Sequence, residues 1–158
     1  MAKKIEKKIT GFSVAKPKST AATEVAVDES EATPIEQMNE HVSRPEMLVG
    51  ATYKIKPPMA DHALYITVND IVLNPDTDHE VRRPYEVFIN SKNMDHYQWV
   101  VALTRVVSAV FRKGGDVTFL VEELKAVFDP KGGYFKGGGK FMPSLVAEIG
   151  EAIETHMI

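Results

Sequence analysis

Cysteine is absent from the 158-residue chain, and tryptophan occurs once. The lack of cysteine excludes disulfide bonds, thiolate metal ligands and cysteine nucleophiles together. The chain also has no apolar run near the ~20 residues that a membrane-spanning helix needs, and its N-terminus lacks the apolar core of a secretory signal. These absences predict a cytoplasmic protein that is not attached to a membrane.

The overall charge is small, with a formal net value of −3, so it gives no global electrostatic reason to expect a nucleic acid or membrane partner. Hydrophobic residues make up 44% of the chain, which is enough for one core. A chain of this length accommodates one ordinary domain and an additional tail. We therefore expect a single folded unit.

The N-terminal part has the composition of a tail. Residues 1–18 contain six lysines against one glutamate, a net charge of +5, whereas residues 19–41 contain six acidic residues and no lysine or arginine. Such a segment buries too little apolar surface to offset the entropy of ordering. We predict a disordered basic-then-acidic tail over residues 1–43 and a folded domain over residues 44–158.

The longest periodic stretch lies at residues 83–113. Tyr85, Val87 and Ile89 alternate with other residues, which is typical of a strand, and from Met94 onward the apolar residues recur every three or four positions, as in a helix. Asn93 and Asp95 are candidate N-cap residues. The apolar arc of this helix is wide enough to include Trp99, so we expect it to be covered on two sides, with Trp99 in the core.

The remaining elements are shorter. Alternating patterns predict strands at 52–55 and 64–68, and apolar stripes predict two further helices, one from about residue 118 to Pro130 and one from Pro143 to the C-terminus. Strands that precede helices indicate an α+β fold. We predict a small antiparallel three-stranded sheet followed by three helices packed on one face.

A glycine-rich loop at residues 129–140 carries lysines that could contact a phosphate, because glycine backbone allows close approach and ammonium groups add charge. It is not a P-loop, since Tyr134 and Phe141 occupy positions where that motif needs glycine and serine or threonine. A mobile connection without a ligand is the simpler interpretation. The candidate anion-binding residues here are Lys131, Lys136 and Lys140.

Four consecutive polar residues, Asn90, Ser91, Lys92 and Asn93, follow the strand and precede the long helix. Capping explains about two of them, so the junction is a second candidate for binding a partner or an anion. The five histidines lack the spacing of metal ligands, and we expect them to be surface or structural residues. The residues indicate no catalytic group and no metal site.

Several segments together resemble one known family. They are GATYKIK (50–56), LYITVNDI (64–71), PYEVFINSKN (84–93) and VEELKAVFDPKGG (121–133). This series is similar to the TSCPD domain over residues 44–154. That domain occurs at the C-terminus of adenosylcobalamin-dependent class II ribonucleotide reductases and as separate accessory chains. The chain departs from the pattern at Met142, which stands where the family motif has its cysteine.

The resemblance implies a non-catalytic accessory or regulatory protein of deoxyribonucleotide synthesis, with a large ribonucleotide reductase chain as partner. Adenosylcobalamin would then belong to that partner, and this chain would bind no cofactor itself. The alternative is a nucleotide- or nucleic-acid-binding module that uses the glycine and lysine loop and the basic N-terminal residues. Self-association through surplus apolar helix surface is compatible with both.

Overall fold

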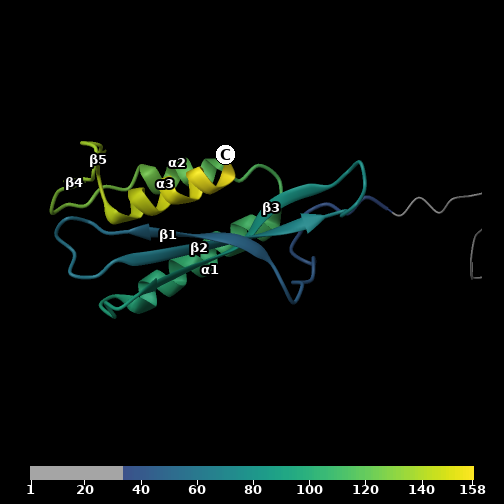
Figure 1. The fold of residues 1–158 in the computed structure, drawn as a ribbon, viewed down its shortest axis with the longest axis horizontal. Helices are drawn as coiled ribbons and strands as arrows, with labels where there is room; N and C mark the ends of the chain where they lie inside the picture. The colour runs from purple at the N-terminus through teal and green to yellow at the C-terminus, as the bar shows by residue number, and fades with distance from the viewer. Residues whose placement is uncertain (1–33) are drawn as a thin grey trace, which may run out of the picture. The chain divides into compact units, whose positions relative to one another are not determined.

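The computed structural model describes residues 34–158, so most of the predicted tail lies outside the described residues. The fold contains three long strands, β1 (Val49–Ile55), β2 (Leu64–Leu73) and β3 (Val81–Ser91), which form an antiparallel sheet in the order β1-β2-β3. Three helices follow, α1 (Tyr97–Lys113), α2 (Thr118–Lys125) and α3 (Leu145–Met157). Before α3, two short strands of two residues each, β4 (Tyr134–Phe135) and β5 (Phe141–Met142), form a hairpin. Figure 1 shows this arrangement.

The predicted α+β fold is confirmed, and one face of the sheet carries the main core. Alternation along β2 and β3 points Ile66, Val68, Val87 and Ile89 to the same side. All three helices contribute to the cluster that these residues form, including Val107 and Phe111 of α1 and Ile153 of α3. Burial of this one face therefore holds the sheet and the helices together.

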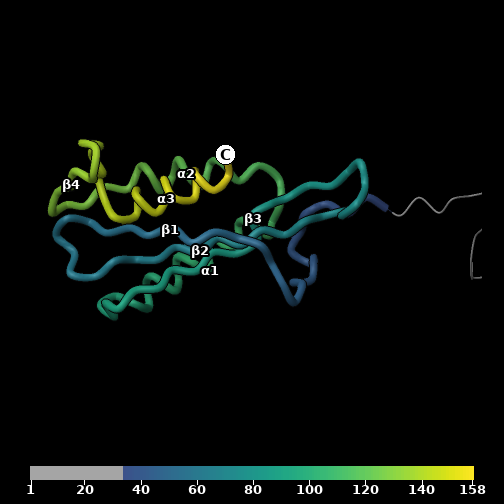
Figure 2. Tube along the Cα trace, viewed as in Figure 1, coloured from purple at the N-terminus to yellow at the C-terminus, as the bar shows by residue number. Residues whose placement is uncertain are grey.

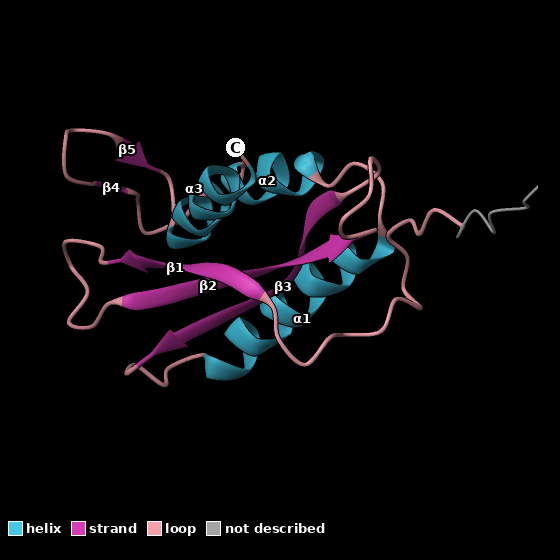
Figure 3. Ribbon diagram, turned by 45° about the vertical axis from the view of Figure 1, so that its right-hand side comes forward, coloured by secondary structure: helices cyan, strands magenta, loops and turns pink. Residues whose placement is uncertain are grey.

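The helices α2 and α3 lie side by side along one side of the strands, as Figure 3 shows. Gly150 of α3 faces Leu124 and Lys125 of α2, and a Cβ atom added there would lie 2.9 Å from the Cβ of Leu124. The close approach of the two helices thus depends on glycine at this position.

Helix α1 lies beside β3, the edge strand opposite to β1 (Figures 1 and 3). Its buried Ser108 bonds to the outer edge of β3. The Val87 N–H donates to Ser108 Oγ at 3.0 Å, and the same hydroxyl donates to the Val87 carbonyl oxygen at 3.4 Å. A side chain of α1 therefore takes the place of a fourth strand at this point and covers an edge that would otherwise be open.

A β-bulge changes the direction of side chains in the middle of β3. Asn69 pairs with Glu86 and Asp70 pairs with Pro84, so Tyr85 is an extra residue without a partner in β2. Tyr85 consequently shares the face opposite the main core with Glu86. There it joins a second cluster with Ile71, Leu73 and Met38.

Residues 34–48 cover one half of this opposite face (Figure 2). Met38 is buried, Val42 and Leu48 pack against the second cluster, and the Tyr85 hydroxyl donates to the Val42 carbonyl oxygen at 3.1 Å. Residues 34–43, which composition assigns to the tail, thus contribute packing contacts to the folded domain.

Two sequence-based predictions for α1 are wrong. The helix begins at Tyr97 rather than Met94, and its N-cap residue is His96, which has a φ of 58° and no side-chain capping bond. Asn93 and Asp95 instead take part in a turn, in which Asn93 Oδ1 accepts from the Asp95 N–H at 2.8 Å. The second error concerns Trp99, which is 68% exposed rather than part of the core.

Replacing Ser108 with alanine should lower the free energy of unfolding by about 1–3 kcal/mol, because the buried N–H of Val87 loses its acceptor. Urea unfolding followed by far-ultraviolet circular dichroism measures this change. Ala109→Ser, on the exposed side of the same helix, is the control and should change stability by less than about 0.5 kcal/mol. Equal stability of Ser108→Ala and the parent protein would contradict the role of Ser108 at the strand edge.

Candidate functional site

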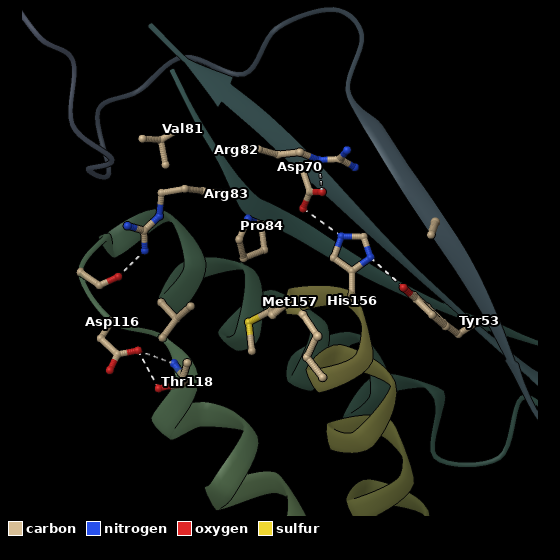
Figure 4. A pocket seen from close by; sticks show the side chains of 14 residues that line it. Tyr53, Asp70, Val81, Arg82, Arg83, Pro84, Asp116, Thr118, His156 and Met157 are labelled. Carbon is tan, nitrogen blue, oxygen red and sulfur yellow. Dashed lines mark hydrogen bonds and ion pairs between the residues drawn. The ribbon is translucent and has the colours of Figure 1, made fainter. Parts of the chain in front are cut away.

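A cavity of about 830 Å³ lies between the end of α3, the start of α2 and strands β1, β2 and β3 (Figure 4). Its polar lining residues come from elements that are distant in the sequence, namely Tyr53, Asp70, Arg82, Arg83, Asp116, Thr118 and His156. Its apolar lining includes Val81, Pro84, Val117 and Met157. A pocket with this mixed lining is the first place to look for chemistry.

A chain of four polar side chains forms one wall of the cavity. Arg82 Nε donates to Asp70 Oδ2 at 2.6 Å, and Asp70 Oδ1 lies 2.9 Å from His156 Nε2. On the other side of the imidazole, His156 Nδ1 lies 3.0 Å from the Tyr53 hydroxyl. The side chains of Asp70 and His156 are only 8% and 6% exposed. These four side chains therefore join β3, β2, α3 and β1, with Asp70 and His156 buried at the centre and Arg82 more than half exposed.

The hydrogen-bond pattern sets the role of His156. A carboxylate only accepts, so Nε2 of the imidazole carries the hydrogen that Asp70 Oδ1 accepts. In a neutral ring, Nδ1 then accepts from the Tyr53 O–H. Both ring nitrogens are used, and the charge of Asp70 is balanced by Arg82. This arrangement fastens the last turn of α3 to the sheet and leaves no lone pair of His156 for a molecule in the cavity.

Sequence reasoning missed this cluster, although two signals indicate it in retrospect. His156 continues the inward stripe of Ile149 and Ile153 along α3, and Asp70 continues the inward alternation of Ile66 and Val68 along β2. A polar residue at each of two inward positions needs a partner. Which residue supplies it depends on the tertiary fold, because Asp70 and His156 are 86 positions apart.

The opposite wall of the cavity joins β3 to the loop before α2. Arg83 Nη2 donates to the carbonyl oxygen of Gly115, and Asp116 Oδ1 accepts from both the side chain and the backbone N–H of Thr118. These two bonds from Thr118 lower the pKa of Asp116 below its ordinary value. The N-cap residue of α2 is Val117, which makes no side-chain capping bond.

Of the four residues in the predicted site at 90–93, two have side chains that form hydrogen bonds within the protein. Ser91 Oγ donates to the Ala63 carbonyl oxygen at 3.3 Å and accepts from the Asn93 N–H at 3.2 Å. Asn93 forms the turn to Asp95, whereas Asn90 and Lys92 are exposed. Ser91 and Asn93 thus shape the connection, and Asn90 and Lys92 remain accessible to a partner.

The glycine and lysine loop includes the β4–β5 hairpin, and its side chains contact α3. Lys136 Nζ and Lys140 Nζ each lie 2.5 Å from a carboxylate oxygen of Glu151, and the Tyr134 hydroxyl donates to Glu148. Of the three predicted anion-binding lysines, Lys136 and Lys140 are therefore brought together, and both pair with a carboxylate of the same chain. Lys131 contributes a backbone N–H to Asp129 Oδ1 at 2.8 Å.

These contacts shift the protonation of the hairpin residues. Burial alone would raise the pKa of Glu151, but hydrogen bonds from Lys136 and Lys140 outweigh it, and the pKa lies below its ordinary value of 4.5. Burial and the bond to Glu148 raise the pKa of Tyr134. Met142, at the position of the family cysteine, is buried in β5, where it serves packing.

Residues 34–158 contain neither a metal-binding cluster nor a membrane-spanning helix. No group of three or more histidine, aspartate and glutamate side chains converges there in a way that could hold a metal ion. Among these residues, no helix combines the length and the apolar character that crossing a bilayer requires.

The sheet, the helices and the polar clusters together define a small α+β domain whose buried polar groups join its elements. The chain belongs to the TSCPD domain family, whose model matches residues 32–157. The match confirms the resemblance and begins earlier than the predicted start at residue 44. No curated protein and no solved structure matches the chain.

Replacing Asp70 with alanine should lower the free energy of unfolding by about 3 kcal/mol, because a buried imidazole and a guanidinium lose their shared acceptor. Tyr53→Phe, which removes a single neutral hydrogen bond, should cost about 1 kcal/mol. Urea unfolding measures both, and Asp78→Asn in the exposed β2–β3 turn is the control. A loss for Asp70→Ala no larger than that for Tyr53→Phe would contradict the central place of Asp70.

The Glu151 pairs should make the protein more sensitive to acid. A carboxylate with a lowered folded pKa adds stability above its unfolded value of 4.5, and this stability is lost as the pH falls through the folded pKa. Glu151→Gln should therefore reduce the decrease in unfolding free energy between neutral pH and pH values below 4.5. Glu154→Gln, in a more exposed pair with Lys125, is the control and should have the smaller effect. An unchanged pH profile for Glu151→Gln would refute the assignment.

Proposed function

We propose that this protein is a non-catalytic accessory chain of a ribonucleotide reductase and docks on the enzyme through the exposed face of α1. The observation that carries the proposal is the exposure of Trp99, the single tryptophan, on the surface of the longest helix. Tryptophan is enriched among the residues that dominate binding at protein interfaces.

Trp99 belongs to an apolar row that follows the helix axis. The row consists of Trp99, Leu103, Val106 and Val110, spaced by four, three and four residues, and we call it the α1 seam. Trp99 and Val106 are its exposed members, Val106 at 60%, whereas Leu103 and Val110 are half-buried and also pack against the main core. Alternating spacings of three and four residues place side chains along one line, as in helices that pack against another helix. The α1 seam therefore suits a helical element of a partner.

The polarity of α1 favours docking over exposure to water. Arg105 is the only charged residue of the helix before Arg112, and the helix has no acidic residue. A helix surface that remains in water normally carries many more charges. The wide apolar arc that predicted burial on both sides thus has one side in the core and the other available to a partner.

The proposed surface continues toward residues 90–93, at the junction between β3 and α1. Met94 and Tyr97, at the start of α1, are both exposed, and Asn90 and Lys92 lie just before them in the chain. An apolar centre with polar residues at its rim is the usual composition of a specific interface. We include Asn90, Ser91, Lys92 and Asn93 in the proposed surface as its polar rim.

The identity of the partner rests on the family. The chain belongs to the TSCPD domain family. The occurrence of this domain with class II ribonucleotide reductases supports a role of the chain in deoxyribonucleotide synthesis. In this proposal adenosylcobalamin and the radical chemistry belong to the large chain, because a cysteine-free chain has no thiol to contribute. The alternative, nucleotide binding through Lys131, Lys136 and Lys140, is not favoured by the pairing of the last two with Glu151.

The proposal is tested with the full-length chain, tagged and purified from its native cells. We expect a large reductase chain to co-purify and to be identified by peptide mass. Trp99→Ala should weaken its binding, measured by interferometry with the isolated reductase, by roughly 30-fold or more. Phe128→Ala, which removes an exposed aromatic residue beyond the end of α2, is the control and should leave the affinity unchanged.

Two results would overturn the proposal. The first is the absence of a reductase chain from the purified material, and the second is unchanged binding by Trp99→Ala. Sedimentation of the isolated protein tests whether the α1 seam binds a second copy of the chain instead of a reductase. A dimer of the parent protein that dissociates in Trp99→Ala would assign the α1 seam to a second copy of this chain instead.

A further inference from the structure

The face of the sheet opposite the main core has one half that no described element covers. We call it the open sheet face. Residues 34–48 cover the other half, around Ile71 and Leu73. Tyr65 and Phe88 are 44% and 48% exposed there, so neither aromatic ring is needed for the core. The open sheet face consists of Thr52, Lys54, Tyr65, Thr67, Phe88 and Asn90.

The strand register fixes how the two rings are arranged. On β2, Tyr65 lies opposite Lys54 on one side and Asn90 on the other, whereas Thr67 lies opposite Phe88. Tyr65 and Phe88 are therefore diagonal neighbours on adjacent strands, at a separation of about 7–8 Å. Two exposed rings at this spacing offer separate flat surfaces, each of which can stack on one planar group of a ligand.

Positive charge lies on both sides of the two rings. A groove of about 360 Å³ between β3 and α1 is lined by Phe88 together with Arg44, Arg105 and Arg112. Beyond Tyr65, the exposed Lys54 occupies the neighbouring position on β1. The aromatic rings are thus flanked by cations from β1, from α1 and from the segment before β1.

The single carboxylate in this groove, Glu86, already has partners. Arg44 Nη2 and Arg44 Nε donate to its two oxygens at 2.9 and 3.0 Å, and Asn69 Nδ2 donates at 2.9 Å. The bond from Arg44 is the main cause of a pKa of Glu86 below its ordinary value. Glu86 therefore neutralises Arg44, and the positive charges of Arg105 and Arg112 remain in excess.

We propose that the open sheet face binds a single-stranded nucleic acid. Unpaired bases stack on Tyr65 and Phe88, and the phosphates between them pair with Arg105, Arg112 and Lys54. Bases in a duplex are already stacked and paired, so exposed aromatic rings select single strands. The amide group of Asn90, beside Tyr65, can hydrogen-bond to the edge of a base. The local excess of cations supplies the attraction that the net charge of the chain does not.

Tyr65 and Phe88 carry this proposal, whereas Trp99 and Val106 carry the proposed docking on a reductase. Asn90 is the one residue that belongs to both surfaces. Around the axis of α1, the directions of Trp99 and Val106 each differ from that of Arg105 by about 100° or more. This proposal also differs from the predicted loop site, since it uses none of Lys131, Lys136 and Lys140. Either proposal can therefore fail while the other stands.

The test is fluorescence anisotropy of the full-length chain with labelled oligonucleotides of about a dozen nucleotides, which suits the size of such sites. Single-stranded DNA and single-stranded RNA are compared with a duplex of the same length. We expect both single strands to bind more tightly than the duplex. The difference in affinity between single-stranded DNA and single-stranded RNA shows which of the two the protein prefers. Phe88→Ala should weaken single-strand binding about tenfold, because it removes one stacking surface.

The arginines are tested through the salt dependence. Replacing Arg105 and Arg112 with alanine should weaken binding and reduce the slope of log affinity against log salt by about one unit for each phosphate that is no longer paired. Phe128→Ala, which removes an exposed aromatic residue outside both proposed surfaces, should bind single strands as the parent protein does. Phe88 is half-exposed, so its variant is expected to fold, and a circular dichroism melt confirms this before binding is measured.

Three outcomes would overturn the proposal. They are no binding of single strands at low salt, equal binding by folded Phe88→Ala and the parent protein, and equally tight binding of polyglutamate. The last result would show that the cations attract an acidic peptide chain without any contribution from base stacking.

Discussion

A three-stranded sheet presents two faces and two edges, and the three helices of this protein cannot cover all four. The inner face receives the main core, built from Ile66, Val68, Val87 and Ile89 with residues of all three helices. The edge of β3 is covered by α1, where Ser108 bonds to the backbone of Val87. What remains is half of the outer face, the β1 edge, which pairs with no further strand among the described residues, and one side of α1. The positions of the proposed binding surfaces follow from this shortage of covering elements.

The buried polar groups serve the same architecture. Asp70 joins β2 to Arg82 of β3 and to His156 of α3, and Glu151 holds both lysines of the β4–β5 hairpin against α3. In both clusters one carboxylate binds two cationic or polar partners from distant parts of the chain. These directional bonds add to the apolar contacts of α3 in the main core and fix the helix more specifically than packing alone.

The sequence predicts the strands and helices well because alternation and helical periodicity are local signals. It does not predict the bulge at Tyr85, since the pairing of Asn69 with Glu86 and of Asp70 with Pro84 is decided across strands. The partners of His156 and Glu151 are also set by the tertiary fold. The prediction for Trp99 failed for another reason: an apolar residue looks the same in a sequence whether it faces a core or a binding partner.

The β-bulge at Tyr85 shifts the inward and outward alternation of side chains along β3 by one residue. Residues after it follow one alternation, and residues before it follow the other, so Arg82 reaches Asp70 while Tyr85 and Glu86 share the opposite face. Deleting Tyr85 would remove the bulge and leave Asn69 opposite Glu86 and Asp70 opposite Pro84, so the side chains from Val81 to Pro84 would keep their directions. A related sequence with a one-residue gap here would therefore be expected to keep the Asp70 cluster and to lose only the contacts that Tyr85 makes with residues 34–48.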